Sequence, residues 1–245
     1  MSMKDLDAAT QLVHAGRDWD PEWGYVNPPV VRASTVLHKS CEDMMDRVHD
    51  EMACRDGKPC YGSYGGPAHK AFYSAMKTLE GPNAAGAWAF STGLAATTTP
   101  LFAFVRAGCH ALFSDSIYGP TREFAEQILR TMGVDVEFFD PAASPEAIEA
   151  MMRPETTLLM MENPGSHSFE MSDVPGIAAA CRGHGVTSVI DNTWATPLYF
   201  KPLDHGVDMV VHAATKYIAG HSDLLMGVVV CNERVWPAVY RTAVR

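Results

Sequence analysis

Residues 207–223 of this chain have the sequence VDMVVHAATKYIAGHSD. The apolar run at 207–211, interrupted only by Asp208, is typical of a buried strand. It leads to one lysine, Lys216, whose small neighbours leave room beside the amine for a bulky partner. An amine held in a packed, dry pocket has a lowered pKa and can attack a carbonyl carbon. The stretch therefore indicates Schiff-base chemistry.

A lone lysine after a strand is more often a solvated loop residue. The signal becomes specific only when the chain also supplies the other parts of a pyridoxal phosphate site. These parts are a cradle for the phosphate, an acid for the pyridine nitrogen and an aromatic side chain to cover the ring.

Composition narrows the class of protein. The formal charge of −10 argues against nucleic acid and against anionic membrane surfaces as partners. No apolar run is long enough to span a bilayer, and residues 1–7 lack the apolar core of a signal peptide, so we expect a cytoplasmic protein. The cysteines are scattered without a C-x-x-C pair, and the histidines lack metal-ligand spacing, so no metal site is predicted.

Strand and helix patterns alternate through most of the chain. Such repeated units predict an α/β fold with a mostly parallel sheet and helices on both faces. We expect strands at 87–90, 110–113, 134–139, 156–161, 186–190, 208–211 and 226–231. We expect helices at 40–52, 67–79, 91–106, from 116–121 to Met132, after Ser144, at 174–184 and from Glu233.

Ligands of such sheets bind beyond the carboxyl ends of the strands. Gly93, Tyr118, Asp191 and Lys216 all follow predicted strand ends, so we expect them to meet at one edge. A strand followed by Ser91 and a helix start offers free amides to a phosphate. Asp191 suits the pyridine nitrogen, although an Asp-Asn-Thr turn cap is the ordinary role for such a residue. Tyr118 suits the ring cover, although it could equally be a core tyrosine.

Several motifs together resemble one family. The segments are NPPVVRAST at 27–35, YGPTR at 118–122, PGS at 164–166, DNTWA at 191–195, ATKY at 214–217 and GHSD at 220–223. They resemble the trans-sulfuration, or Cys/Met-metabolism, family of pyridoxal phosphate-dependent enzymes over nearly the whole chain. The resemblance implies the large domain of an aspartate-aminotransferase-like, fold type I enzyme.

The resemblance also implies site roles, which fall on matching positions. Lys216 would carry the cofactor and move protons, Asp191 would pair with the pyridine nitrogen, and Tyr118 would stack on the ring. The phosphate would be bound by the amides of Gly93 and Leu94, by Thr215, and by Tyr61 of a neighbouring subunit. The last contact implies a homo-oligomer, a dimer or a tetramer.

The implied activity is α,β-elimination of cystathionine to homocysteine, pyruvate and ammonia, a step of methionine biosynthesis. Two alternatives stay open: γ-synthase or γ-lyase chemistry on a thioether amino acid, and a non-catalytic cofactor-binding fragment. Residues 1–60 show little sustained periodicity and are interrupted by Pro21, Pro28, Pro29 and Pro59. We expect them to form an arm that contacts a neighbouring subunit, with a poorly ordered terminus as the alternative. Residues 61–245 would form the cofactor-binding domain.

Two departures from the family pattern bear on these expectations. Relatives carry a phosphate-binding arginine where this chain has Ser63, so weaker cofactor binding is predicted. Relatives also continue into a C-terminal domain whose arginine binds the substrate carboxylate, and this chain stops at Arg245. A generic nucleotide-binding domain is disfavoured, because no G-x-G-x-x-G follows a strand.

Overall fold

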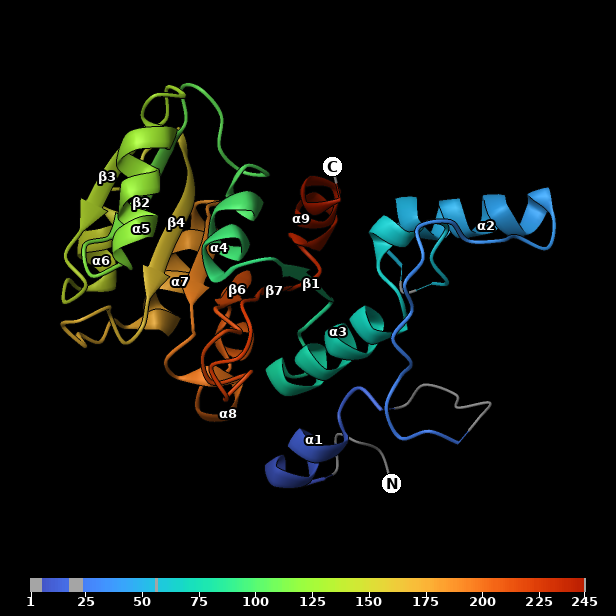
Figure 1. The fold of residues 1–245 in the computed structure, drawn as a ribbon. Helices are drawn as coiled ribbons and strands as arrows, with labels where there is room; N and C mark the ends of the chain where they lie inside the picture. The colour runs from blue at the N-terminus through green and yellow to red at the C-terminus, as the bar shows by residue number, and fades with distance from the viewer. Residues whose placement is uncertain (1–5, 18–23, 56, 245) are drawn as a thin grey trace.

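The structure is a computed structural model that describes residues 6–17, 24–55 and 57–244. The first five residues, and Pro21 within the predicted arm, lie outside the described part. The described chain forms a seven-stranded sheet in the order β1-β7-β6-β5-β4-β2-β3 (Figure 1). The strands are β1 (Gly86–Phe90), β2 (His110–Ser114), β3 (Asp135–Phe139), β4 (Thr156–Glu162), β5 (Thr187–Asp191), β6 (Met209–His212) and β7 (Gly227–Cys231).

The sheet is mostly parallel, as predicted. Strands β2 to β6 pair in parallel, whereas β7 runs antiparallel to both of its neighbours, β1 and β6. The carboxyl ends of β2, β4, β5 and β6 therefore lie along one edge. This arrangement places the segments that follow them side by side.

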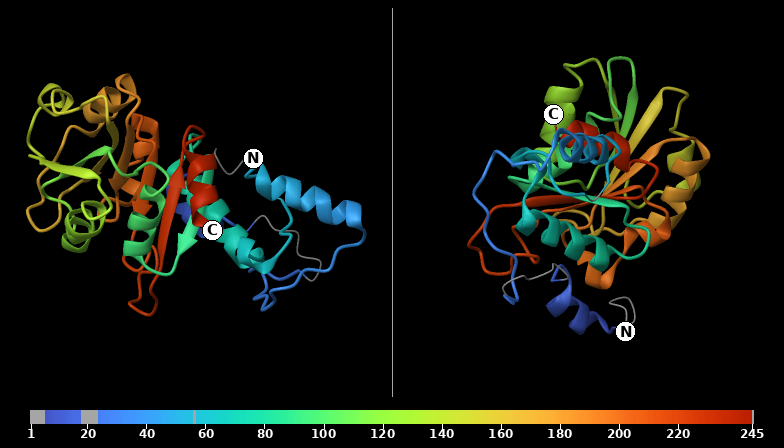
Figure 2. Two further views of the ribbon diagram at one scale, coloured as in Figure 1. Left: turned by 90° about the horizontal axis from the view of Figure 1, so that it is seen from above. Right: turned by 90° about the vertical axis from the view of Figure 1, so that its right-hand side faces the viewer.

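Helices cover both faces of the sheet. In Figure 2, α4 and α5 lie on one face and α7 on the other. Helix α3 packs on β1 and β7, α4 on β6 and β7, and α7 on β5. The helical elements are α1 (Ala8–His14), α2 (Cys41–Met52), η2 (Gly62–Tyr64), α3 (Pro67–Glu80), α4 (Gly93–Leu101), α5 (Gly119–Glu123), η3 (Phe124–Leu129), α6 (Pro145–Glu149), α7 (Val174–Gly183), α8 (Thr196–Tyr199), η4 (Pro202–His205) and α9 (Trp236–Ala243).

Helix starts follow local capping chemistry. Side chains of Ser40, Thr92, Ser144 and Asp173 each accept a backbone amide hydrogen bond from the first turn of the helix that follows. Three predicted boundaries are wrong. The helix expected to reach Met132 ends at Leu129. The helix expected to reach residue 106 ends at Leu101, because Pro100 has no amide to donate and the chain then turns. The last helix begins at Trp236, not at Glu233.

The centre of the sheet is fully buried, including the one acid in the apolar run at 207–211. Asp208 lies just before β6, where its Oδ2 accepts from the Ser188 amide at 3.0 Å. Its Oδ1 accepts from Asn232 and from Nε of Arg234, both at 2.9 Å. A buried carboxylate is tolerated because it is fully hydrogen-bonded. The residue thus joins β5, β6 and the segment after β7.

The N-terminal segment extends away from the sheet, with α2 at the far side of the molecule from β3 (Figure 1). Its Val30 and Leu37 side chains are largely exposed. The end of α2 is attached to α9, where the Tyr240 hydroxyl donates to the carboxylate of Glu51. The indole of Trp236 also donates to the carbonyl of Cys54 at 3.3 Å.

Candidate active site

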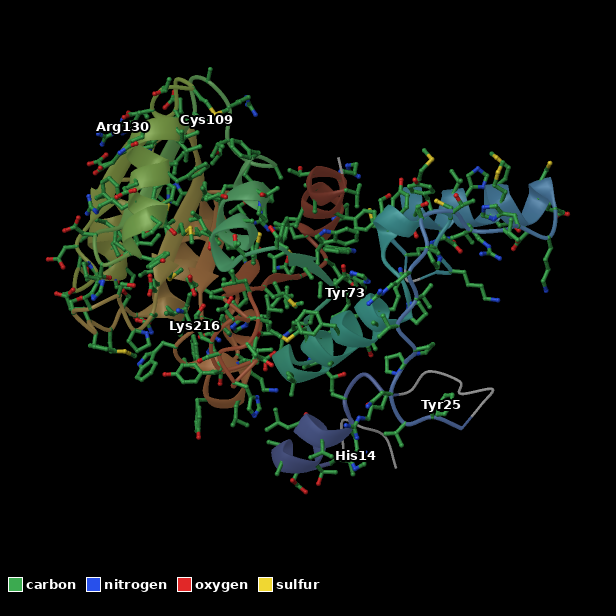
Figure 3. The ribbon with its side chains drawn as sticks, viewed as in Figure 1. His14, Tyr25, Tyr73, Cys109, Arg130 and Lys216 are labelled. Carbon is green, nitrogen blue, oxygen red and sulfur yellow. The ribbon has the colours of Figure 1, made fainter. Side chains whose placement is uncertain are left out.

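The candidate site lies where several strands end. Tyr118 follows β2, Glu162 ends β4, Asp191 ends β5, and Lys216 follows β6. Glu162 and Asp191 are direct partners in the β4–β5 register. Lys216 lies at this lower edge of the sheet in Figure 3. The expected convergence at one edge is therefore confirmed for these strands.

The lysine turn is anchored by its backbone. The Lys216 amide donates to the carbonyl of Ala213 at 2.9 Å, and Gly220 donates to the carbonyl of Lys216 at 2.8 Å. The Lys216 side chain is exposed to a cavity of about 910 Å³. A packed, dry pocket was expected around the Lys216 amine. This expectation is wrong for the single chain, because the Lys216 side chain is exposed. The lining residues are Glu162, Thr193, Trp194, Thr215, Lys216, Tyr217, Gly220, Ser222, Asp223, Leu224 and Leu225.

Ala213 connects three parts of the site. Its amide donates to Oγ1 of Thr193 at 2.8 Å, in the turn after β5. Its carbonyl accepts from Lys216. A methyl group built on Gly93 would lie 2.7 Å from its Cβ, so only glycine lets α4 begin this close. The helix start, the acid turn and the lysine turn therefore meet at one residue.

Asp191 is a buried acid, with 9% of its surface exposed. Its Oδ1 accepts from the Thr193 amide at 3.0 Å. Burial raises the pKa of its carboxyl, while the hydrogen bonds from Thr193 and the charge of His212 oppose this shift. Because burial removes water from this carboxylate, a cationic partner would stabilise it strongly. A protonated pyridine nitrogen would supply that positive charge.

Glu162 is a site residue that the sequence analysis missed. Burial, and then the charge of Asp191, raise the pKa of its carboxyl to about 7. A carboxyl with a strongly perturbed pKa in a cleft is a marker of a functional site. The signal that could have found it is the one that selected Asp191, an acid at the carboxyl end of a predicted strand.

The start of α4 offers an anion site. The Thr92 side chain accepts from the Ala95 amide at 3.1 Å, and its carbonyl accepts from Ala96. The amides of Gly93 and Leu94, in the first turn of the helix, have no intrahelical acceptor. They can bind a phosphate together with the positive end of the helix dipole.

The hydroxyl of Thr215 is directed elsewhere than predicted. It donates to the carbonyl of Met226 at 3.1 Å and accepts from the Met226 amide at 3.0 Å. These two hydrogen bonds connect the start and the end of the loop between β6 and β7. Binding a phosphate through this hydroxyl would require the Met226 contact to break.

The two tyrosines are placed differently. Tyr118 precedes α5 with 46% of its surface exposed, and its amide donates to Oε2 of the cavity-lining Glu162 at 2.7 Å. Tyr61 precedes η2 with 48% exposed and forms a β-bridge with Thr35. Within the described chain it is not among the residues that line the cavity of Lys216. The contact of Tyr61 with a neighbouring subunit remains a prediction.

These features fit pyridoxal phosphate. The start of α4 has amides free for a phosphate. The buried Asp191 forms no salt bridge among the described residues, and Lys216 lines a cavity with space for a ring. Among the described residues there is no helix that could cross a membrane. In the same part of the chain, no group of three or more acidic, histidine or cysteine side chains could hold a metal.

The fold and site define the fold type I class of pyridoxal phosphate-dependent enzymes. The model of the Cys/Met metabolism PLP-dependent enzyme family matches residues 9–243, and the chain belongs to this family. Its members depend on pyridoxal phosphate.

Three similar proteins illustrate the range of the family. A Rhizobium johnstonii protein, provisionally named a cystathionine β-lyase, is 45% identical over 241 residues, 96% of this chain and 58% of the relative. An L-alanine/L-glutamate racemase of Wolbachia pipientis is 37% identical, over 94% of this chain and 58% of its own. Cystathionine γ-lyase from Lactobacillus plantarum, whose crystal structure contains L-serine, is 29% identical in sequence. Its structure superposes with a TM-score of 0.85 over 100% of this chain and 58% of its own. The chain thus spans about 58% of the length of these relatives.

Proposed function

We propose that this chain belongs to a pyridoxal phosphate-dependent carbon–sulfur lyase acting on cystathionine. The proposed reaction is α,β-elimination, in which cystathionine and water give homocysteine, pyruvate and ammonia, a step of methionine biosynthesis. The observation that carries the proposal is the junction at Ala213, which joins the start of α4, the turn after Asp191 and the Lys216 turn.

The cofactor, when bound, would withdraw electrons from the substrate α-carbon. Asp191 would hold the positive charge of the pyridine nitrogen, and burial makes that pairing strong. The amides of Gly93 and Leu94 would orient the phosphate. Tyr118 would cover one face of the ring. These contacts would place the substrate Cα–H bond within reach of the lysine turn.

Lys216 would transfer the protons. Its Nζ would take the proton from the substrate α-carbon as a general base. It would then supply a proton to the sulfur that leaves the β-carbon. The cavity lined by Lys216 supports this role, because it leaves space beside the amine.

The proposal extends to the assembly. The exposed apolar side chains of the N-terminal arm, residues 1–60, favour a contact with a neighbouring subunit, whose site Tyr61 would complete. The cofactor-binding domain would be residues 61–245, the functional unit a dimer or tetramer, and the location cytoplasmic.

The experiment uses purified protein with added pyridoxal phosphate. We expect a visible absorbance band, covalent label after borohydride reduction, and pyruvate release from cystathionine. The label should vanish in Lys216→Ala and persist in Lys70→Ala, a lysine of α3 outside the cavity. Label that is unchanged in Lys216→Ala would overturn the assignment of this lysine.

The alternatives correspond to other outcomes. An absorbance band without pyruvate, but with 2-oxobutyrate from the same substrate, would indicate γ-elimination. A band without turnover of any thioether amino acid would indicate a cofactor-binding chain. The presence of Ser63 in place of the family arginine favours this second alternative.

A further inference from the structure

Glu162 makes two short hydrogen bonds that join two loops of the site. The Tyr118 amide donates to its Oε2 at 2.7 Å, and the Ser166 hydroxyl donates to its Oε1 at 2.7 Å. Tyr118 belongs to the segment between β2 and α5, whereas Ser166 follows β4. We propose that Glu162 is a positioning residue, which sets the place of the ring-covering Tyr118 by holding its backbone amide.

Tyr118 is held by hydrogen bonds at both its backbone carbonyl and its backbone amide. Its carbonyl accepts from the amides of Thr121 and Arg122 at 2.9 and 3.0 Å, which ties it to the first turn of α5. Its side chain makes no capping bond to that helix and is about half exposed. The amide bond to Glu162 therefore fixes the other end of the residue. Without it, Tyr118 could rotate with the loop that precedes the helix.

The backbone of Glu162 is held by the sheet. It is the last residue of β4 and pairs in register with Asp191 on β5. The Ser166 amide donates to the carbonyl of Ser116 at 2.8 Å. A methyl group on Gly165 would meet the Ser116 side chain at 2.4 Å, so the two loops are closely packed. Glu162 thus pairs with Asp191 through its strand and with Tyr118 through its carboxyl.

A purely electrostatic role is the competing explanation, in which the charge of Glu162 acts only on its neighbour Asp191. The two roles differ in what glutamine can do. A glutamine at 162 keeps an acceptor for the Tyr118 amide and can donate to Ser166, yet it carries no charge. An alanine removes the acceptor and the charge together.

The first test needs no cofactor. Hydrogen exchange of the Tyr118 amide should be slow in the wild-type chain and in Glu162→Gln. It should be at least about tenfold faster in Glu162→Ala, because the acceptor is lost. Glu170→Ala is the matched control. This exposed carboxylate lies in the loop after β4, which also contains Ser166, and it accepts a hydrogen bond from the Ser168 hydroxyl. Equal exchange in all four proteins would overturn the proposal.

The second test rests on the proposed function and measures the dissociation constant of pyridoxal phosphate by absorbance. We expect about tenfold weaker binding in Glu162→Ala and less than about threefold in Glu162→Gln. Tyr118→Ala should weaken binding in the wild-type chain but add little in Glu162→Ala, because Glu162 acts through Tyr118. Full additivity, or equal effects of glutamine and alanine, would overturn the positioning role. Wild-type protein that binds no cofactor would instead overturn the proposed function.

Discussion

Nε2 of His212 lies 2.5 Å from Oε1 of Glu80, and both side chains are 99% buried or more. The two residues are 132 positions apart and join the end of α3 to the end of β6. The remaining polar atoms, Oε2 of Glu80 and Nδ1 of His212, find no hydrogen-bond partner among the described residues. Each side chain therefore depends on the other for its burial.

Replacing Glu80 with alanine should strongly destabilise the fold. It would leave the buried Nε2 of His212 without its hydrogen-bond partner, which costs about 1–3 kcal/mol. Urea denaturation measures the loss. Glu149→Ala is the matched control, because its pair with His184 at 2.8 Å is largely exposed and should contribute less than about 1 kcal/mol. Equal losses in the two variants would contradict the role given to burial.

Gly93→Ala should weaken cofactor binding about tenfold with a modest loss of stability. The added methyl group would lie 2.7 Å from Cβ of Ala213, which forces the start of α4 away from the lysine turn. The free amides would then move from the phosphate. The measurement is the dissociation constant of pyridoxal phosphate. Gly183→Ala, where a methyl group meets nothing within 4 Å, should bind as the wild type does.

The cofactor-free protein should lose stability as pH rises, partly through Glu162. Burial and Asp191 raise the pKa of this carboxyl from 4.5 to about 7. The folded state therefore holds its proton more tightly than the unfolded state, so the stabilisation is complete below pH 4.5 and disappears as pH rises through 7. Glu162→Gln should be more stable than the wild type by about 1–3 kcal/mol at pH 8, and the gain should shrink towards pH 5. A gain independent of pH, measured by denaturant titration, would contradict the shift.

Ser63→Arg should tighten cofactor binding by about tenfold or more, because a charged contact to phosphate is worth more than a neutral hydroxyl. Ser63 is exposed in η2, beside Tyr61, where an arginine side chain has space. The same substitution at the exposed Met132 controls for the added positive charge. An equal effect of both variants would show that net charge, not position, is responsible. An unchanged affinity in Ser63→Arg would remove the argument.

Much of this architecture follows from local sequence. The runs at 156–161, 186–190 and 226–231 indicate strands, because each is short and bounded by turn residues, and the last two are rich in β-branched side chains. Their alternation with capped helices requires a mostly parallel sheet. The positions of Asp191 and Lys216 after strands then place them at one edge. The lysine motif also identified the family, which the family match confirms.

The tertiary structure decided what depends on contacts between distant segments. The pairing of Glu80 with His212, the hold of Glu162 on Tyr118 and the direction of the Thr215 hydroxyl join residues from different loops or elements. Periodicity and capping describe neighbours along the chain, so they carry no information on these distances. The sequence by itself predicted which residues could perform the chemistry, because side-chain type and position after an apolar run are local properties. Their burial and mutual distances arise only when the folded sheet brings its strand ends together.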